Sequence, residues 1–282
     1  MPEAGSTKRL LRRWVSSASF FALIGLIIGA LISIPAIHRP YIGTITISGT
    51  IMTQTYADDI LEMLSYARDN RDIKAVVLQI DSPGGEASAI ERIYLDVLRL
   101  RSQKPVIASI GAWGASGGYY IAVASSFIYA QPSSQLGSVG AWGTLPTPEE
   151  LEEDVIPTGP FKSTGGSRRK ATADLETVKQ EFLSAVISQR GIGLKLSPEE
   201  LGRAQIYSGV ESLKYGLVDA IGTSSAAVEK AARLAKIRNY GLININEKLG
   251  IYRPVSIYFS MEDLTAQTSL MPRYYYLYFE SR

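Results

Sequence analysis

Apolar residues change their spacing along this chain, from alternate positions to a helical period and back, and the changes predict a series of strands and helices. Residues 41–51, "YIGTITISGTI", carry β-branched residues at alternate positions and predict a strand. Residues 56–70 place apolar side chains at helical spacing and predict a helix. Residues 75–80, "AVVLQI", are almost continuously apolar, which is typical of a strand covered on both faces.

The same alternation continues through the middle of the chain. We expect an amphipathic helix over 89–101, a buried strand over 105–111, a helix of small residues in the second half of 112–125 and a short strand over 127–131. Strands that alternate with helices form βαβ units. The pattern therefore predicts an α/β fold with a mainly parallel sheet.

The signals weaken towards the C-terminus. We expect an acidic helical segment over 144–155, a loop over 158–170, a helix over 173–189, a capped helix start in "LSPEEL" at 196–201, and a strand, turn and helix over 215–237. The tail "PRYYYLYFESR" is aromatic. Its partner is a neighbouring subunit, a bilayer surface or the protein's own core, and the sequence leaves all three open.

The N-terminal segment predicts a membrane anchor. Residues 14–37 contain no charged side chain, and about 20 apolar residues suffice to cross a bilayer as a helix. Four basic residues precede this run and only Arg39 follows it closely, so the positive-inside rule places residues 1–13 in the cytoplasm. We therefore expect a single-pass protein of the cell membrane, with an extracytoplasmic domain at 41–240 and a C-terminal extension at 241–282.

The amino-acid composition excludes several kinds of catalytic and binding site. The 282-residue chain has a net charge of +2, with acids and bases in balance, and gives no indication of a nucleic-acid partner. It has no cysteine, which excludes a disulfide, a thiolate nucleophile and a cysteine metal site. Its only histidine, His38, follows the apolar run and is interpreted as an interfacial residue. Chemistry in the body of the chain must proceed without imidazole, and no metal or cofactor site is predicted.

Two glycine-rich segments follow buried strands. "DSPGG", residues 81–85, comes after the strand ending at Ile80, and "GAWGASGG", residues 111–118, ends the next strand. Because ligands of a parallel sheet bind beyond the carboxyl ends of its strands, both segments should face one cleft. Ser116, at a helix start, would then lie between amides of "DSPGG" and the amide of Gly117, the arrangement that acyl transfer requires.

Two other interpretations of Ser116 compete with this one. Residues 114–118 match G-x-S-x-G, the nucleophile elbow of α/β-hydrolases, but that fold needs a histidine after the serine and none follows. The elbow is therefore excluded on chemical grounds. The second alternative is that the glycines only permit close packing and that Ser116 is an ordinary polar residue. The second glycine-rich loop, at another strand end, favours catalysis.

A serine hydroxyl is a weak nucleophile and needs a base, for which a carboxylate and a neutral lysine are the candidates here. Burial and nearby positive charge both lower the pKa of a lysine. Lys162 has such surroundings in the sequence, because a proline and a phenylalanine precede it and two arginines follow it. The residues favour Lys162 only modestly over Lys170.

Five segments match one family in their order and approximate spacing: "LQIDSPGG", "IASIGAWGASGGYYIAVAS", "SSQLGSVGAWG", "TGPFKSTGGSRRKATADLE" and "GRAQIYSGVESLKYGLVDAIG". Over residues 41–236 the chain resembles signal peptide peptidase A in its short, single-copy form. The resemblance implies the crotonase/ClpP-like α/β fold and a membrane-anchored serine peptidase with a Ser/Lys dyad. It also implies Ser116 as the nucleophile, Lys162 as the general base, and Gly85 and Gly117 as the oxyanion donors.

At the lysine the chain departs from the family pattern, with Thr158 in place of serine and Ser163 in place of aspartate, and neither change removes the amine. Ser138, in "GSVG", either orients the lysine or is an ordinary turn serine. The resemblance further implies a homo-oligomeric ring, with serine and lysine supplied by neighbouring subunits. The implied substrates are remnant signal peptides, bound by strand addition beside "GSVG", with small or aliphatic side chains near Val139 and Ala141.

Three other functions are compatible with the sequence. A related group of membrane proteases that cleave stomatin-like proteins resembles the chain in fold and dyad, although the lysine context and "YSGVESLKYGLVDAIG" favour the first family. A crotonase-fold acyl-CoA enzyme would use the two amides to bind a thioester, but the anchor and the external location argue against it. A non-catalytic anchored scaffold would bind peptides without cutting them.

Overall fold

The computed structural model describes residues 19–29, 39–145, 158–159, 161–162, 165–252 and 273–278. The chain divides into two units, Met1–Arg39 and Pro40–Arg282. In the first unit, residues 19–29 form a helix whose side chains are mostly exposed. The rest of the membrane span expected at 14–37, and His38, lie outside the described residues. None of the helices in the described part of the chain is both long and apolar enough to cross a membrane.

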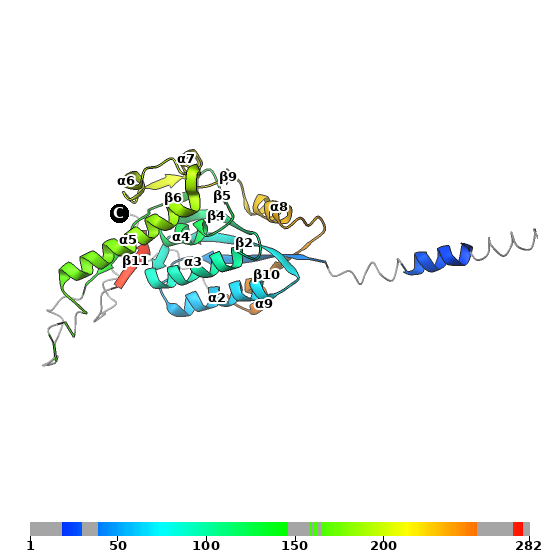
Figure 1. Ribbon diagram of the computed structural model, residues 1–282, viewed down its shortest axis with the longest axis horizontal. Helices are drawn as coiled ribbons and strands as arrows, with labels where there is room; N and C mark the ends of the chain where they lie inside the picture. The colour runs from blue at the N-terminus through cyan, green and yellow to red at the C-terminus, as the bar shows by residue number, and fades with distance from the viewer. Residues whose placement is uncertain are drawn as a thin grey trace, which may run out of the picture. The chain divides into compact units, whose positions relative to one another are not determined.

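The second unit is built on a sheet of eight described strands. They are β1 (Tyr41–Ser48), β2 (Ile73–Ser82), β4 (Val106–Ala115), β5 (Phe127–Ala130), β6 (Gln135–Gly137), β8 (Ile206–Ser208), β9 (Ala220–Ile221) and β10 (Gly241–Asn244). The main path runs β10-β1-β2-β4-β5-β9, and every neighbouring pair on it is parallel. β6 pairs with β4 in parallel, and β8 pairs with β6 in the antiparallel direction. The mainly parallel α/β sheet expected from the sequence is confirmed (Figure 1).

Helices cover both faces of this sheet. The described helices of this unit are α2 (Gln54–Asp69), α3 (Ala87–Arg101), α4 (Gly117–Val123), α5 (Arg168–Arg190), α6 (Pro198–Leu201), α7 (Gly209–Tyr215), α8 (Ser224–Leu234) and α9 (Ile245–Leu249), with a 3-10 turn at Gly191–Gly193. Val76 and Leu78 of β2 belong to the core cluster that includes α2, α3, α4 and α5. Ala75 and Val77 belong to the cluster that includes α8. Successive residues of a strand face opposite sides, so this double covering explains why β2 is apolar at consecutive positions.

A second, smaller sheet has three strands, β3 (Gly84–Glu86), β7 (Trp142–Thr144) and β11 (Arg273–Leu277). β11 lies between the other two and runs antiparallel to both. It is the red arrow in Figure 1. Of the three partners left open for the aromatic tail, the described part of the tail therefore finds its partner in the protein's own fold.

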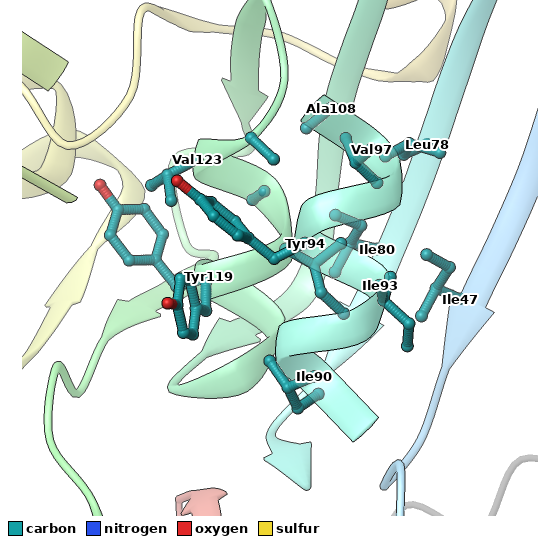
Figure 2. Packing of buried hydrophobic residues seen from close by; sticks show 14 of the residues in the cluster. Ile47, Leu78, Ile80, Ile90, Ile93, Tyr94, Val97, Ala108, Tyr119 and Val123 are labelled. Atoms are coloured by element: carbon teal, nitrogen blue, oxygen red, sulfur yellow. The ribbon is translucent and has the colours of Figure 1, made fainter. Parts of the chain in front are cut away.

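The packing of α3 fixes the glycine-rich segment before it. Figure 2 shows Ile90, Ile93 and Val97 on the side of α3 that faces Leu78 and Ile80 of β2. Each of these side chains is at most 1% exposed, and full burial of such a side chain contributes about 1.5–3 kcal/mol. Because β3 leads directly into α3, this packing also holds the glycines of β3 in place.

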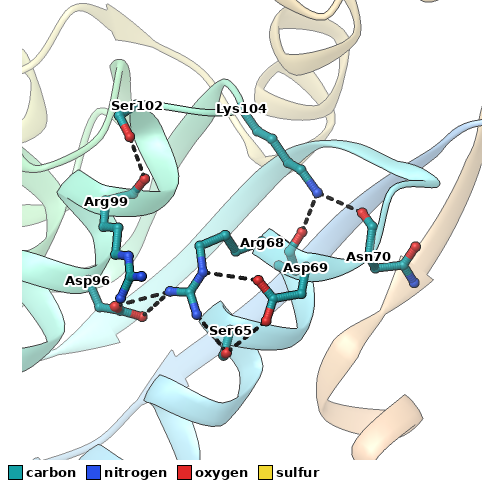
Figure 3. A network of polar contacts seen from close by, with 9 residues as sticks. Ser65, Arg68, Asp69, Asn70, Asp96, Arg99, Ser102 and Lys104 are labelled. Carbon is teal, nitrogen blue, oxygen red and sulfur yellow. Dashed lines mark hydrogen bonds and ion pairs between the residues drawn. The ribbon is translucent and has the colours of Figure 1, made fainter.

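Polar contacts join α2 to α3 and close the end of α2 (Figure 3). The guanidinium of Arg68 lies 3.2 Å from the carboxylate of Asp96 on α3. The Lys104 Nζ donates to the carbonyls of Ala67 and Asn70, at 2.7 and 2.6 Å. These carbonyls belong to the C-terminal turn of α2, where intrahelical donors run out. The contacts therefore stabilise the pair of helices that packs on one face of the sheet over β1 and β2.

Capping residues decide two boundaries in the C-terminal half. The loop expected over 158–170 is shorter than expected, because the Ser167 Oγ accepts an N–H of the first turn and α5 already begins at Arg168. The capped start expected at "LSPEEL" is confirmed, since Ser197 and Glu200 form a reciprocal capping box at α6.

Two other expected segments have different outcomes. Most of the acidic segment expected over 144–155 lies outside the described residues. The extension after residue 240 begins with β10, whose Gly241 pairs with Tyr41 of β1. The first residues of that extension are therefore part of the main sheet.

Candidate active site

Ser116 occupies a strained, buried junction between β4 and α4. Its φ is 50° and its ψ is −119°, a conformation that residues other than glycine rarely adopt. Its N–H donates to the Gly137 carbonyl at 2.8 Å, its carbonyl accepts the N–H of Tyr120 at 2.9 Å, and the residue is 1% exposed. Such a conformation costs about 1–3 kcal/mol and persists only where the surroundings impose it, as they often do at functional sites.

Glycines of the two segments come together beside Ser116. A Cβ built on Gly84, where φ is +108°, would lie 2.7 Å from the Gly117 nitrogen. A Cβ on Gly85 would lie 2.0 Å from the Ile51 carbonyl oxygen, and one on Gly117 would lie 2.8 Å from Ile90. Real Cβ atoms essentially never come so close to another heavy atom, so these positions require glycine. The structure thus brings "DSPGG" and "GASGG" into one site, as their positions at strand ends predict.

Two polar residues of "DSPGG" hold that segment in place, a role that the sequence analysis missed. The Asp81 carboxylate accepts the N–H of Trp113 at 2.8 Å and so links the segment to β4. The buried Ser82 Oγ donates to the Gly49 carbonyl at 2.6 Å and accepts the N–H of Gly84 at 3.1 Å. The turn-forming side chains of Asp and Ser before Pro-Gly-Gly are the signal that could have identified them.

Ser138 lies in the strand-end loop beside Ser116. Gly137, the last residue of β6, is in register with Ala115, the last residue of β4. Ser138 is the next residue, with φ at 51° and its N–H donating to the Gln205 carbonyl at 2.8 Å. Both serines therefore follow paired strands at the same edge of the sheet, each in a strained conformation.

The two candidate lysines differ in their surroundings. Lys162 is exposed, in a turn where its N–H donates to the Gly159 carbonyl at 3.1 Å. The contacts described for Ser116 and Lys162 do not join these two residues within the chain. Lys170 is ion-paired with Asp174, whose hydrogen bond raises the pKa of the lysine. Because an ammonium stabilised in this way is a poor base, the geometry disfavours Lys170.

Known proteins resemble this chain over most of its second unit. The sequence model of peptidase family S49 matches residues 99–238, and that of Clp protease matches residues 41–136. Protease 4 of Haemophilus influenzae is 31% identical over 217 residues, which are 70% of this chain and 35% of that protein. The match to Protease 4 of Salmonella typhi covers 32% of that protein. The chain thus spans about a third of the length of these relatives.

Two further comparisons cover larger shares of both partners. A putative protease of Synechocystis sp. is 30% identical over 211 residues, which are 70% of this chain and 75% of that protein. A mutant of the 1510-N membrane-bound stomatin-specific protease, solved in complex with a substrate peptide, is similar with a TM-score of 0.51 and 16% identity. That similarity covers 81% of this chain and 96% of the solved chain, and it concerns the fold.

The fold and the family follow from these matches. The Clp protease match and the parallel sheet establish a ClpP-like α/β fold. The S49 match includes Ser116 and Lys162, and the Synechocystis relative is matched over most of both chains. The chain belongs to peptidase family S49, the serine protease family of signal peptide peptidase A.

Proposed function

We propose that this protein is a serine endopeptidase with Ser116 as nucleophile and Lys162 as general base. The observation that carries the proposal is the meeting of Gly84 and Gly85 with Gly117 around a buried, strained serine. Two backbone amides directed at one point beside a hydroxyl stabilise the oxyanion of acyl transfer. Without cysteine, and with the only histidine outside this unit, a carboxylate and a lysine remain as candidate bases, and membership of the S49 family favours the lysine.

The proposed reaction proceeds in two steps, acylation of Ser116 and hydrolysis of the acyl-enzyme. The Ser116 Oγ attacks the carbonyl carbon of the substrate, its proton passes to the Lys162 amine, and the negative oxygen is stabilised by the amides of Gly85 and Gly117. The C–N bond breaks, the leaving amine takes the proton, and an ester to Ser116 remains. Water then attacks the ester and gives a proton to the Lys162 amine. The bond between the carbonyl carbon and the Ser116 Oγ breaks, and this oxygen takes the proton from Lys162, so that a carboxylic acid and the free serine are formed.

The exposure of Lys162 supports a base that is completed by a second subunit. A lysine acts as a base when it is withdrawn from water, whereas Lys162 is exposed in the single chain. We therefore propose a homo-oligomeric ring in which a neighbouring subunit covers Lys162, and in which Ser138 orients the amine. Serine and lysine of one site then come from two chains.

The substrates and the location belong to the same proposal. The apolar run at 14–37 supports a single-pass anchor with the enzyme outside the cytoplasm, and the S49 relatives include a putative signal peptide peptidase A of Enterococcus faecium. We propose that the protein degrades remnant signal peptides and other apolar peptides beside the membrane. Activity toward stomatin-like proteins is the alternative, and it is supported by the likeness of the fold to the stomatin-specific protease.

Hydrolysis of an apolar fluorogenic peptide by the full-length protein in detergent tests the proposal. Ser116→Ala should lower kcat by about 10⁴-fold or more, because the nucleophile is lost. Ser125→Ala is the matched control, since Ser125 is also buried and its Oγ has no hydrogen-bond partner among the described residues. The control should keep wild-type activity. Equal activity of Ser116→Ala and wild type would contradict the proposal, and peptide binding by an inactive wild type would favour the scaffold.

A further inference from the structure

The edge of the main sheet opposite to Ser116 carries an excess of positive charge. Strands β10, β1, β2 and β4 are neighbours and parallel, so the segments that lead into them lie at one edge, which we call the amino edge. Residues 70–74 enter β2, 102–105 lead into β4 and 235–241 enter β10. These segments contain five basic side chains and a single acidic one, Asp72. The net charge of the whole chain is only +2, so positive charge is concentrated at this edge.

Packing in the segment before β10 leaves two basic side chains in solvent. The backbone of Lys236 has a φ of 57°, and its N–H donates to the Arg233 carbonyl at 3.1 Å at the end of α8. Ile237 and Tyr240 pack against the apolar cluster that includes α8. Lys236 and Arg238 are exposed. The apolar residues therefore fix the segment, and the two cations remain on the surface.

The segment before β2 is also fixed, and it presents two more cations. The Asp72 N–H donates to the Asn70 Oδ1 at 2.9 Å, and the Asp72 carbonyl accepts the N–H of Tyr41 at 2.8 Å. Arg71 and Lys74 are exposed, and the Lys74 Nζ donates to the Arg71 carbonyl at 2.8 Å. The Lys74 ammonium is thus held beside Arg71, on a turn that is hydrogen-bonded to the first residue of β1.

The fifth basic side chain is used within the fold. The Lys104 Nζ donates to two carbonyls at the C-terminal end of α2, as Figure 3 shows. Burial, and after it the charge of Lys74, lower the pKa of Lys104, whereas Asp69 acts in the opposite direction. Asp69 is itself ion-paired with Arg68 at 3.2 Å. Four basic side chains of the amino edge therefore remain on the surface. These edge cations are Arg71, Lys74, Lys236 and Arg238.

The chain enters the second unit in the middle of this edge. Tyr41, the first residue of β1, pairs with Ile73 on one side and with Gly241 on the other, so the segments that carry the edge cations lie on both sides of it. Tyr41 is 38% exposed, and its ring lies against Gly241, where a built Cβ would be 2.6 Å from the ring. Tyrosine is enriched at the interface between membrane and water, which an exposed tyrosine among cations would suit.

The apolar run of the N-terminal segment ends close to Tyr41 in the sequence. Only three residues separate Ile37, the last residue of that run, from Tyr41. An extended chain spans at most about 3.6 Å per residue, so the two residues can be no more than about 15 Å apart. If residues 14–37 cross the bilayer as proposed, the amino edge lies near the lipid headgroups.

We propose that the edge cations bind the phosphate groups of anionic lipids and hold the second unit with its amino edge against the membrane. The inference rests on the proposed membrane anchor and adds a second contact to it. Each Lys or Arg near an anionic lipid surface strengthens the attraction about fivefold. In this orientation Ser116, which follows the opposite end of the ten-residue strand β4, is held about 30 Å from the headgroups. Its substrates are then peptides that have left the bilayer.

The absence of cysteine from the chain allows a probe to be placed at one chosen residue. Ser102, directly after α3, is exposed at the amino edge, and Ser88, in the first turn of α3, is exposed at the other end of the helix. The two positions are about 21 Å apart along the helix axis. Ser102→Cys and Ser88→Cys, each in the full-length protein, are labelled with a fluorophore and reconstituted in vesicles whose headgroups carry a nitroxide quencher.

Two kinds of vesicle provide the comparison. One contains phosphatidylglycerol and phosphatidylcholine in equal amounts, and the other contains only phosphatidylcholine. We expect quenching of the Ser102→Cys label to be about two- to threefold stronger in the anionic vesicles, and quenching of the Ser88→Cys label not to increase. Salt at about 1 M should remove the difference, because it reduces the Debye length to about 3 Å.

Charge-neutralising variants assign the effect to the edge cations. R71Q/K74Q/K236Q/R238Q should bring quenching of the Ser102→Cys label in anionic vesicles down to its value in phosphatidylcholine. The matched control, R169Q/K179Q/R203Q/K248Q, removes the same charge from α5, α9 and the loop after α6, and it should leave quenching unchanged. The edge variant should keep wild-type peptide hydrolysis in detergent, which also shows that it is folded. Equal quenching in both kinds of vesicle, or quenching that survives in the edge variant, would overturn the inference.

Flotation of the same proteins with vesicles separates this inference from the proposed anchor. Wild type that floats with both kinds of vesicle, but whose Ser102→Cys label shows no dependence on lipid charge, leaves the anchor in place and overturns the lipid contact. Wild type that floats only with anionic vesicles and is released by salt contradicts the anchor and supports the contact. Loss of peptide hydrolysis by wild type would contradict the peptidase proposal alone.

Discussion

The two halves of the proposed dyad have very different settings. Ser116 lies at the junction of β4 and α4 and is 1% exposed. Its backbone N–H and its carbonyl are both hydrogen-bonded. Lys162 is exposed in a short turn. The parallel sheet therefore fixes the proposed nucleophile and its proposed oxyanion donors within one chain, whereas the proposed base lies in a turn outside the sheet. If the proposed dyad is correct, the serine side is preorganised in the single chain and the lysine side depends on what covers Lys162.

The largest expected effect is the loss of catalytic rate when the proposed base is removed. Lys162→Ala should lower kcat by about 10² to 10⁴-fold, the usual contribution of a general base. Lys170→Ala should stay near wild type, because Lys170 forms an exposed ion pair with Asp174. Peptide hydrolysis by both variants, with circular dichroism to confirm folding, measures this. An inactive Lys170→Ala beside an active Lys162→Ala would move the base to Lys170.

The next effect is a loss of stability when a glycine of β3, beside Ser116, gains a side chain. Gly85→Ala should destabilise the protein by about 1–3 kcal/mol, because the new Cβ would lie 2.0 Å from the backbone oxygen of Ile51. A loss of this size lowers the melting temperature by roughly 2–12 °C in a domain of this size. Gly193→Ala is the matched control, since no heavy atom lies within 4 Å of its built Cβ. Similar melting temperatures for the two variants would mean that the backbone of β3 can move to accommodate the new Cβ, contrary to this prediction.

A smaller effect is expected at the hydrogen bond that ties α4 to the main domain. The buried Tyr119 hydroxyl donates to the Leu217 carbonyl at 2.7 Å. Tyr119→Phe removes this bond and should cost about 1 kcal/mol of the free energy of unfolding, as denaturant titration would measure. Tyr252→Phe, at an exposed tyrosine, should leave that free energy unchanged. An unchanged value for Tyr119→Phe would show that α4 does not depend on this bond.

The smallest effect is a dependence of stability on pH at Glu91. Burial raises the pKa of Glu91 above its usual 4.5, so the folded state binds this proton more tightly than the unfolded state. The stabilisation is complete below the unfolded pKa and is lost as pH rises through the folded pKa. Glu91→Gln should therefore melt slightly higher than wild type at neutral pH and equally at pH 4. A difference that grows as pH falls would contradict the raised pKa.

The sequence predicts the parts of the fold that rest on local patterns. The continuous apolar run of β2 and the helical spacing of α3 indicate the βαβ units, and the ends of those strands indicate where Ser116 and the glycine segments meet. β3, β7 and β11 were not expected, because each is short and its pairing depends on residues far along the chain. The aromatic pattern of β11 does not show that its partner is Gly85.

The candidate site was predictable to a similar degree. Gly117 and the "DSPGG" glycines follow from backbone chemistry at strand ends, and the structure brings them together. Lys162 rests on a resemblance and on neighbours in sequence, because the position of a loop residue is not encoded in local periodicity.

The central claim, that Ser116 is an activated nucleophile, is tested most directly by labelling the full-length protein with a small fluorophosphonate and mapping the adduct by peptide mass spectrometry. We predict a single phosphonyl group on Ser116 in wild type and none in Ser116→Ala. Adducts on another serine, or labelling that persists at the same level in Ser116→Ala, would contradict the account.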